Sequence, residues 1–452
     1  MEENIRTYVR FRPTLNEGET AVFDIQGHCI STAKGTFSFD NVFDTDATQL
    51  DIYKSIGEKL VKHVISGYNS CIFAYGQSNS GKSFNTFNII NESDYGLVPR
   101  CLVAIFNALN GNPKLLNSSV KLSFLEIYLE NIRDLFSTEK EFLKLREHKT
   151  KGVYVEGLIQ RDIRSANEGI RQILQALNNR MSASTKLNDT SSRSHAVITI
   201  YIEQEFAEET LSSRLNLCDL CGSEDVRKSE VTGLNLIEAQ KINQSLSALG
   251  NVISALTEKN RSHIPYRDSK LTFFLSQSIG GNSQTAVLSC ATKQAIHYAD
   301  TINTLKFTSR VKLIKNQPTI NKYESIKMLK EKIETLEAEL AELKDYKNQV
   351  EVVERSDLDS VKLNYYQRKM ERMERKIVAQ AHDLAEIEHL YNNQREHAQS
   401  VSDRLYEEQL LGIKLKIEND VLKQFYFNLK ASDGNDRILG CIVKKFELVE
   451  LE

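Results

Sequence analysis

Apolar residues follow two different patterns along the chain. Before about residue 310, short apolar runs rich in branched and aromatic side chains alternate with stretches in which apolar residues recur every three or four positions. The runs are typical of buried strands and the periodic stretches of amphipathic helices. The clearest expected strands are 70–76, 121–129, 195–204, 213–220 and 285–292, and the clearest expected helices are 48–67 and 167–179. This alternation predicts an α/β fold for residues 1–310, with a central mixed sheet flanked by helices.

A heptad pattern replaces this alternation after residue 322. Apolar residues then follow a 3–4 spacing, interrupted by Lys347, at Ile326, Leu329, Ile333, Leu336, Leu340, Leu343 and Val350. We interpret residues 323–424 as a helical coiled-coil stalk. A long helix folded back on its own domain would show the same period, and a looser apolar set from Met370 to Tyr391 favours further helix.

Proline marks the boundary between the two patterns. All five prolines lie at or before Pro318, and the remaining residues contain none. We therefore interpret 311–322 as a linker between the α/β domain and the stalk. Residues 425–452 form a small C-terminal segment with a turn signal at Asp433-Gly434, for which a hairpin or cap is expected.

Composition and charge exclude several classes of protein. The net charge of −3 argues against a generally basic nucleic-acid binder. Residues 317–452 hold 22 basic and 27 acidic side chains, so the preceding part is slightly basic and suits an acidic partner. No stretch approaches about 18 consecutive apolar residues, so no membrane span is predicted. Seven scattered cysteines favour reduced thiols, and the Cys218–Cys221 pair lacks the second pair that a zinc site needs.

The sharpest motif is a phosphate-binding loop. It consists of Gly76, Gln77, Ser78, Asn79, Ser80, Gly81, Lys82 and Ser83, between an expected strand and an expected helix. The glycines let backbone N–H groups surround phosphates, and the helix N-terminus adds positive potential. Lys82 would reach the β- and γ-phosphates of a nucleoside triphosphate, and the Ser83 hydroxyl would ligate Mg²⁺.

Two further segments narrow the class of phosphate-binding protein. Residues 188–195, NDTSSRSH, gather hydroxyls, one Arg and one His, which suit Mg²⁺, water and a γ-phosphate. Asp219 ends an apolar run and is followed by Gly222 and Glu224. A carboxylate at the end of a buried strand is where such enzymes hold a Mg²⁺-associated Asp. Each segment alone also fits an ordinary turn, but their joint occurrence in this order favours a nucleotide-hydrolysing site.

Together these residues resemble the kinesin superfamily of the N-terminal motor type. The same resemblance includes VRFRP at 9–13, FLEIYLENIRDLF at 124–136, HIPYRDSKLT at 263–272 and LKFTSRVKLIKN at 305–316. The resemblance spans about residues 4–322. The sequences of the matching stretches are most similar to those of conventional kinesin heavy chains. The resemblance implies a microtubule-stimulated ATPase with ATP and Mg²⁺ at the phosphate loop.

The family's functional residues are implied where its motifs match. Arg10, Arg12 and Pro13 would frame the adenine, and Phe84 would stack beside it. Ser192 would join Ser83 around Mg²⁺, with Asp219 acting through water. Gly222 would sense the γ-phosphate through its backbone N–H, while Arg193 and Glu224 would form a salt bridge that closes the site and positions the lytic water.

The resemblance also implies a track and a mechanical element. Microtubule contacts are expected at Lys149, Lys151, Arg161, His263, Tyr266, Arg267 and Lys270. Residues 311–322 resemble a neck linker that docks when ATP is bound, with Asn321 as a latch, and directs movement to the plus end. The stalk implies a homodimer, and the location would be the cytoplasm, on the microtubule cytoskeleton. Cargo is not indicated.

The chain departs from the family pattern at four positions. Ser78 and Ser83 stand where kinesins usually have Thr, and both keep a hydroxyl. Cys221 replaces the usual Ala, and Asp225 stands where a basic residue is common, which would weaken track affinity. The alternatives are a non-motile microtubule-binding scaffold with residual nucleotide binding, an unrelated P-loop enzyme with a helical tail, and a microtubule depolymerase.

Overall fold

The computed structural model describes residues 2–13, 23–139, 141–148, 152–184, 193–224, 234–258 and 263–324, with single helical positions between 328 and 378. The chain divides into two units, Met1–Leu329 and Lys330–Glu452. The seam residues of the predicted coiled coil and the segment 425–452 lie outside the described residues. The stalk therefore stays a prediction, and all described strands belong to the first unit.

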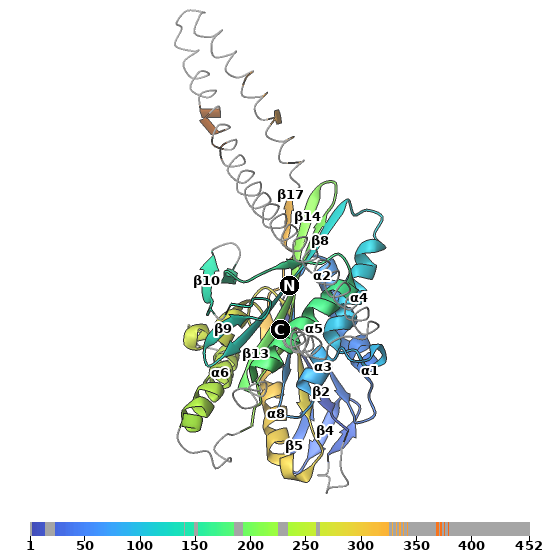
Figure 1. Cartoon of the computed structure of the whole chain (residues 1–452), viewed down its shortest axis with the longest axis vertical. Coiled ribbons are helices and arrows are strands. Elements are labelled where there is room, and N and C mark those ends of the chain that lie inside the picture. The colour runs from blue at the N-terminus through green and yellow to red at the C-terminus, as the bar shows by residue number, and fades with distance from the viewer. Residues whose placement is uncertain are drawn as a thin grey trace, which may run out of the picture. The chain divides into compact units, whose positions relative to one another are not determined.

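A mixed sheet forms the centre of the first unit, with ten strands among the described residues (Figure 1). Its order is β12-β8-β13-β14-β7-β15-β2-β6, with β9 beside β8 and β17 beside β14. Neighbours from β12 to β14 pair antiparallel, and neighbours from β14 to β6 pair parallel. The strands are β2 Arg6–Phe11, β6 Asn41–Phe43, β7 Ser70–Tyr75, β8 Asn117–Tyr128, β9 Asn131–Asp134, β12 Arg161–Asp162, β13 His195–Glu205, β14 Glu209–Asp219, β15 Gln284–Ala291 and β17 Lys322–Glu324. All five expected strands are present, and the predicted mixed sheet is confirmed.

Helices cover both faces of this sheet (Figure 1). The described helices are α1 Gln49–Ile52, α2 Glu58–Ile65, α3 Lys82–Phe87, α4 Leu97–Asn110, α5 Ala166–Ser184, α6 Leu234–Thr257, α7 Lys270–Phe274 and α8 Tyr298–Val311. The expected helix 48–67 is interrupted by a π-helical turn, Tyr53–Gly57, between α1 and α2. The expected helix 167–179 lies within α5.

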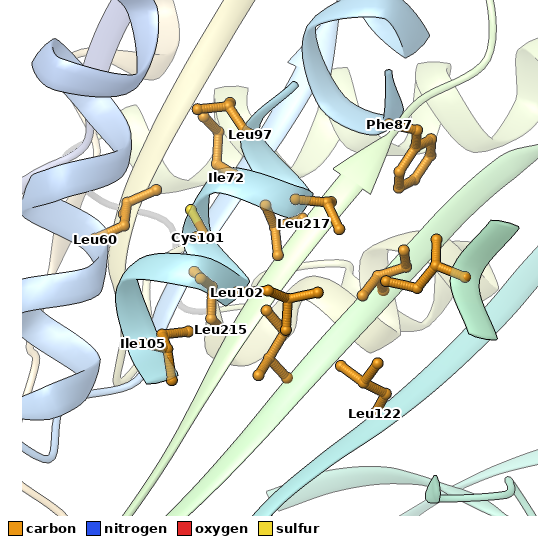
Figure 2. Close-up of a cluster of buried hydrophobic side chains, with 14 of the residues drawn as sticks. Leu60, Ile72, Phe87, Leu97, Cys101, Leu102, Ile105, Leu122, Leu215 and Leu217 are labelled. Carbon is orange, nitrogen blue, oxygen red and sulfur yellow. The ribbon is translucent and has the colours of Figure 1, made fainter. Parts of the chain in front are cut away.

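The two faces of the sheet bury two separate apolar clusters, as the period of two in its strands requires. Ile72 belongs to the cluster under α2, α4 and α5, which Figure 2 shows with Leu102 and Leu217. Phe73, the next residue of β7, belongs to the cluster under α6, α7 and α8, together with Leu249. The central strands are therefore buried on both sides, which explains their continuous apolar runs.

Three smaller sheets complete the first unit. A three-stranded sheet contains β3 Asp24–Gln26, β4 Cys29–Thr32 and β5 Gly35–Ser38, and a hairpin contains β10 Lys144–His148 and β11 Gly152–Glu156. The third joins the two ends of the unit, because β1 Glu3–Asn4 pairs with β16 Lys315–Asn316.

The parallel pairing of β7 and β14 brings the predicted site together. Asp219, the last residue of β14, lies opposite Ala74 near the end of β7. Because parallel strands end at the same edge of a sheet, the loop that follows β7 and the segment that follows β14 emerge side by side. This topology places the phosphate loop next to residues 220–224.

Candidate functional site

The loop between β7 and α3 has the backbone shape that its sequence predicts. Gly76 has a φ of 145°, and a Cβ there would collide with the carbonyl oxygen of Cys290. Gly81, directly before α3, has a φ of 98°. Only glycine adopts such values readily. The two glycines therefore fix a tight loop of the kind that presents successive backbone N–H groups to a phosphate.

Lys82 is buried at the start of α3. Its side chain is 8% exposed, and its ammonium donates to the carbonyl oxygens of Gly76 and Gln77 at 2.9 and 2.8 Å. Both acceptors are neutral, whereas a buried cation is stabilised most by an opposite charge. The phosphates of a nucleotide would supply that charge, so Lys82 fits the predicted role.

Ser83 and Asp219 form the arrangement expected beside Mg²⁺. The Ser83 hydroxyl donates to Oδ2 of Asp219 at 2.5 Å, while Oδ1 of this buried carboxyl has no hydrogen-bond partner among the described residues. Burial raises the pKa of Asp219, partly offset by the charge of Lys82 and the Ser83 hydrogen bond. Mg²⁺ prefers oxygen ligands and usually keeps several bound waters. The Ser83 hydroxyl could be such a ligand, and the unpartnered oxygen of Asp219 could accept from a bound water. The donor set therefore fits the ion.

Glu224 connects the segment after β14 to the phosphate loop. Its carboxylate accepts from the Ser78 N–H at 2.8 Å and from the Ser78 hydroxyl. A Cβ on Gly222 would lie too close to that carboxylate and to that hydroxyl, so both side chains would have to move. The Glu224–Ser78 contact was not foreseen from the sequence. The predicted bridge between Glu224 and Arg193 stays a prediction.

Arg10 and Phe84, two of the residues predicted to bind the adenine, lie beside one another. The buried Arg10 guanidinium lies 5.5 Å from the centroid of the Phe84 ring, and the ring is 47% exposed. Arg10 also donates to the carbonyl oxygen of Ala47 at 3.0 Å and to Oδ1 of Asn85. An exposed aromatic face beside a fixed cation is suited to stacking a base.

The other two residues predicted for the base lie at the end of β2. The Arg12 guanidinium donates to Oε1 of Gln294 at 3.1 Å, and Pro13 is exposed. Ser192 lies outside the described residues, so its predicted place beside Mg²⁺ stays a prediction.

A buried ion pair supports the segment around residue 194. Arg180 of α5 donates from Nε to Oε1 of Glu126 in β8 at 2.9 Å, and both side chains are nearly inaccessible. The Ser194 hydroxyl donates to the same carboxylate oxygen at 2.6 Å and accepts from Arg180 at 2.9 Å. Removing one partner of a buried pair costs on the order of 3–5 kcal/mol. The family-like stretch 124–136 includes Glu126, but nothing in the sequence pairs this residue with Arg180, which is 54 positions away.

His195 is fully buried beside this network and uses both ring nitrogens. Nδ1 accepts from the Cys221 N–H at 3.1 Å, and Nε2 lies 2.8 Å from the Ser245 hydroxyl in α6. Burial, reinforced by the charges of Arg180 and Lys82, lowers the pKa of His195 from 6.5 to about 3. The folded protein therefore keeps this ring neutral.

The depressed pKa of His195 has a consequence for stability. Between pH 6.5 and about 3 the unfolded chain binds a proton at this residue that the folded chain excludes. The free energy of unfolding therefore falls as pH decreases through this window, by up to about 1.4 kcal/mol per pH unit from this group. Urea unfolding at pH 7 and pH 5.5 should show a smaller loss for His195→Gln than for the wild type. Equal losses would contradict the burial of a neutral histidine.

Comparison with known proteins decides the family. A model of the kinesin motor domain matches residues 10–314. This chain belongs to the kinesin family. It is 41% identical over 332 residues to a kinesin heavy chain of Syncephalastrum racemosum, covering 70% of this chain and 36% of that protein. The kinesin-1 heavy chain of Rattus norvegicus is 40% identical over 328 residues, covering 71% of this chain and 34% of that protein.

A solved kinesin structure matches the fold as well as the sequence. It is described as the structure of a fast kinesin, with implications for its ATPase mechanism and interactions with microtubules. The match has a TM-score of 0.67 and 38% identity, and it covers 71% of this chain and 94% of that one. The predicted similarity to conventional kinesin heavy chains is confirmed. The chain spans about a third of the length of the curated relatives given above.

Four of the seven residues predicted to contact the kinesin track lie close together after α6. His263 and Lys270 are exposed. The Arg267 side chain, 72% exposed, pairs with Glu147 of β10 at 2.6 Å. The Tyr266 hydroxyl instead donates to the carbonyl oxygen of Ile279 at 2.6 Å, and burial raises its pKa to about 12. The charged residues of this group form an accessible surface, whereas the Tyr266 hydroxyl stabilises the loop.

The remaining predicted track residues are not part of this group. Arg161 lies on β12, where its guanidinium stacks on Phe136 at 4.6 Å and donates to the Phe136 carbonyl oxygen at 2.8 Å. Phe136 belongs to the apolar cluster on the other face of the sheet from α6. Lys149 and Lys151 lie outside the described residues, as does Asp225.

The segment after α8 makes backbone and side-chain contacts with other parts of the first unit. The helix α8 ends at Val311, and β16 then pairs with β1. Asn321 donates from its backbone N–H and its amide to the carbonyl oxygen of Gly67 at 2.9 and 3.1 Å. Its side-chain oxygen accepts from Asn282 at 3.1 Å, and its carbonyl accepts from the Ser212 N–H at 3.0 Å. One asparagine thus joins three neighbouring segments.

Cys218 lies in β14, and Cys221 lies two residues after the end of that strand. Both are buried free thiols, and burial raises the pKa of Cys221 to about 12. Cys218 contacts Cys71 of the neighbouring strand.

Among the described residues, no helix is both long and apolar enough to cross a bilayer.

Proposed function

We propose that this chain is a microtubule-stimulated ATPase and a plus-end-directed motor. One observation supports this most strongly: Lys82, the Ser83–Asp219 pair and the Glu224–Ser78 contact all meet at one edge of the sheet. A scaffold with residual nucleotide binding could also keep the buried lysine and the carboxylate, but it would not require a glutamate held against the loop. This combination suits phosphoryl transfer.

ATP and Mg²⁺ would be held by the residues of this edge. The loop from Gly76 to Ser83 would bind the phosphates, with Lys82 turning from its carbonyl partners to the β- and γ-oxygens. Ser83 would ligate Mg²⁺ directly, with Ser192 beside it and Asp219 acting through water. The ion would neutralise charge on the phosphates. The adenine would stack on Phe84.

Hydrolysis would depend on the position of Glu224. In this structure its carboxylate is engaged by Ser78, which keeps it beside the loop. We propose that ATP releases it from Ser78 to form the bridge with Arg193, and that this bridge orients the attacking water. Gly222 would bind the γ-phosphate through its N–H. Positioning and electrostatics, rather than covalent chemistry, supply most of the rate in such sites.

The track would contact the exposed cations after α6, because tubulin is acidic and long-range attraction assists binding.

Replacing Arg267 and Lys270 together with alanine should therefore raise the microtubule concentration for half-maximal ATPase by about three- to tenfold. Activity without microtubules should not change. Steady-state ATPase at two salt concentrations measures this effect, with the exposed Lys114→Ala as control. A double variant with unchanged half-saturation would remove these residues from the interface.

The segment 311–322 would convert nucleotide state into direction. In the described structure it is paired with β1 and held through Asn321, which fits a docked state. A bias of a few kcal/mol from nucleotide would be sufficient to populate docked and released states. The stalk would join two chains as a homodimer on cytoplasmic microtubules.

A further inference from the structure

A buried histidine links the nucleotide-sensing segment to the helix that precedes the track loop. His195 begins β13 and is 2% exposed. Its ring contacts Cys221, the residue before Gly222, and Ser245 in α6. These contacts span 26 and 50 positions of sequence. One side chain therefore connects three elements that local motifs treat as separate.

The geometry determines which nitrogen of His195 carries the proton. Nδ1 accepts a hydrogen from the Cys221 backbone, so it cannot carry one itself. The proton of the neutral ring is then on Nε2, which donates to the Ser245 hydroxyl. A protonated ring would lose the bond to Cys221. The neutral tautomer is thus the form that holds both partners.

The two partners lie at opposite ends of the proposed coupling. Cys221 directly precedes Gly222, whose N–H would bind the γ-phosphate, so a backbone shift at Gly222 also moves the Cys221 N–H. Ser245 lies in α6, which contacts α7, α8 and the short helix Tyr266–Asp268 with Arg267. The helix α8 leads into the segment 312–322. The ring therefore joins the Cys221 backbone to α6 through two hydrogen bonds.

We propose that His195 is a positioning residue that transmits nucleotide-dependent movement of residues 221–222 to α6 through its hydrogen bond to Ser245. This inference rests on the proposed function, because it requires a γ-phosphate sensor and a track. His195 does not touch the reacting atoms in this scheme. It acts by fixing the distance between the Cys221 backbone and the Ser245 hydroxyl.

The competing interpretation is that His195 only satisfies polar groups in the core. Both interpretations predict some loss of stability when the ring is removed, since buried groups lose partners. They differ in what Ser245 does. If the bond transmits movement, loss of the Ser245 hydroxyl uncouples the track from turnover but leaves nucleotide chemistry intact. If the bond only fills the core, ATPase with and without microtubules changes in parallel.

The test removes the hydroxyl from α6 and leaves His195 and Cys221 in place. Ser245→Ala in the full chain should lower the maximal microtubule-stimulated ATPase roughly fivefold, which is the order expected for one buried hydrogen bond. Basal ATPase and the half-saturating ATP concentration should stay at wild-type values. Ser245→Thr, which keeps a hydroxyl, should restore most of the stimulation. Ser247→Ala, an exposed serine on the same helix, is the matched control.

The outcomes separate this inference from the proposed function. A wild-type chain without stimulation by microtubules would overturn the proposed function and this inference with it. A stimulated wild type with Ser245→Ala equal to Ser247→Ala would overturn the inference alone. Parallel loss of basal and stimulated activity in Ser245→Ala would also overturn it, as would a failure of Ser245→Thr to restore the ratio between them.

Discussion

Replacing Lys82 with alanine is expected to abolish ATP turnover. The structure buries this ammonium beside the phosphate loop, where it donates to the carbonyl oxygens of Gly76 and Gln77. Because it would contact the phosphates directly, its loss removes charge stabilisation where negative charge moves during transfer. Loss of one such preorganised donor typically lowers the rate by at least about 100-fold. Steady-state ATPase at saturating ATP and microtubules is the measurement.

Two further variants show whether the effect depends on the position of the lysine or only on its charge. Lys54→Ala removes an exposed lysine between α1 and α2 and should leave turnover unchanged. Lys82→Arg keeps the charge in a larger, planar group and should also be inactive, because the buried space accommodates a compact ammonium. If Lys82→Ala turned over ATP within about threefold of the wild type, the assignment of the phosphate site would be wrong.

Replacing Glu224 with alanine should stop hydrolysis while ATP still binds. The carboxylate contacts the phosphate loop through the backbone N–H and the hydroxyl of Ser78, and in the proposed mechanism it positions water rather than binding phosphate. We therefore expect turnover to fall at least about 100-fold, with little change in the affinity for a fluorescent ATP analogue. A rapid-quench experiment should show loss of the phosphate burst.

Ser78→Ala provides the matched test of the contact seen in this structure. It removes the hydroxyl donor but retains the N–H donor and the carboxylate. If the Ser78 contact only holds Glu224 beside the loop before ATP binds, Ser78→Ala should hydrolyse ATP at a rate close to that of the wild type.

For the Glu224→Ala variant, an intact phosphate burst would refute the proposed role of the carboxylate.

Much of the fold could be predicted because its central strands are buried on both faces. Residues 71–75 of β7 and 196–202 of β13 are mostly apolar, and the loop after β7 is a specific motif. The sequence also predicted that Ser83 and Asp219 would act on the same Mg²⁺ ion. The phosphate-loop motif indicated Ser83, and the position at the end of a buried strand indicated Asp219. Parallel strand order then brings them to 2.5 Å.

The polar network behind the site could not be predicted in the same way. Glu126, Arg180, His195 and Ser245 come from β8, α5, β13 and α6, and their contacts depend on how the layers pack rather than on any local spacing. The π-helical turn at Tyr53–Gly57 was missed for a related reason, because the apolar period is the same on both sides of it. The stacking of Arg161 on Phe136 was not indicated by the sequence either, and the predicted track contact of Arg161 stays a prediction.

The most direct test of this account is the ATPase rate of the purified full chain with and without microtubules at low salt. The proposed motor predicts a rise of about tenfold or more, together with ATP-driven gliding of microtubules over the immobilised protein. A slow rate that stays flat when microtubules are bound, and stays flat in a fragment ending at residue 329, would contradict the proposal and favour a non-motile scaffold.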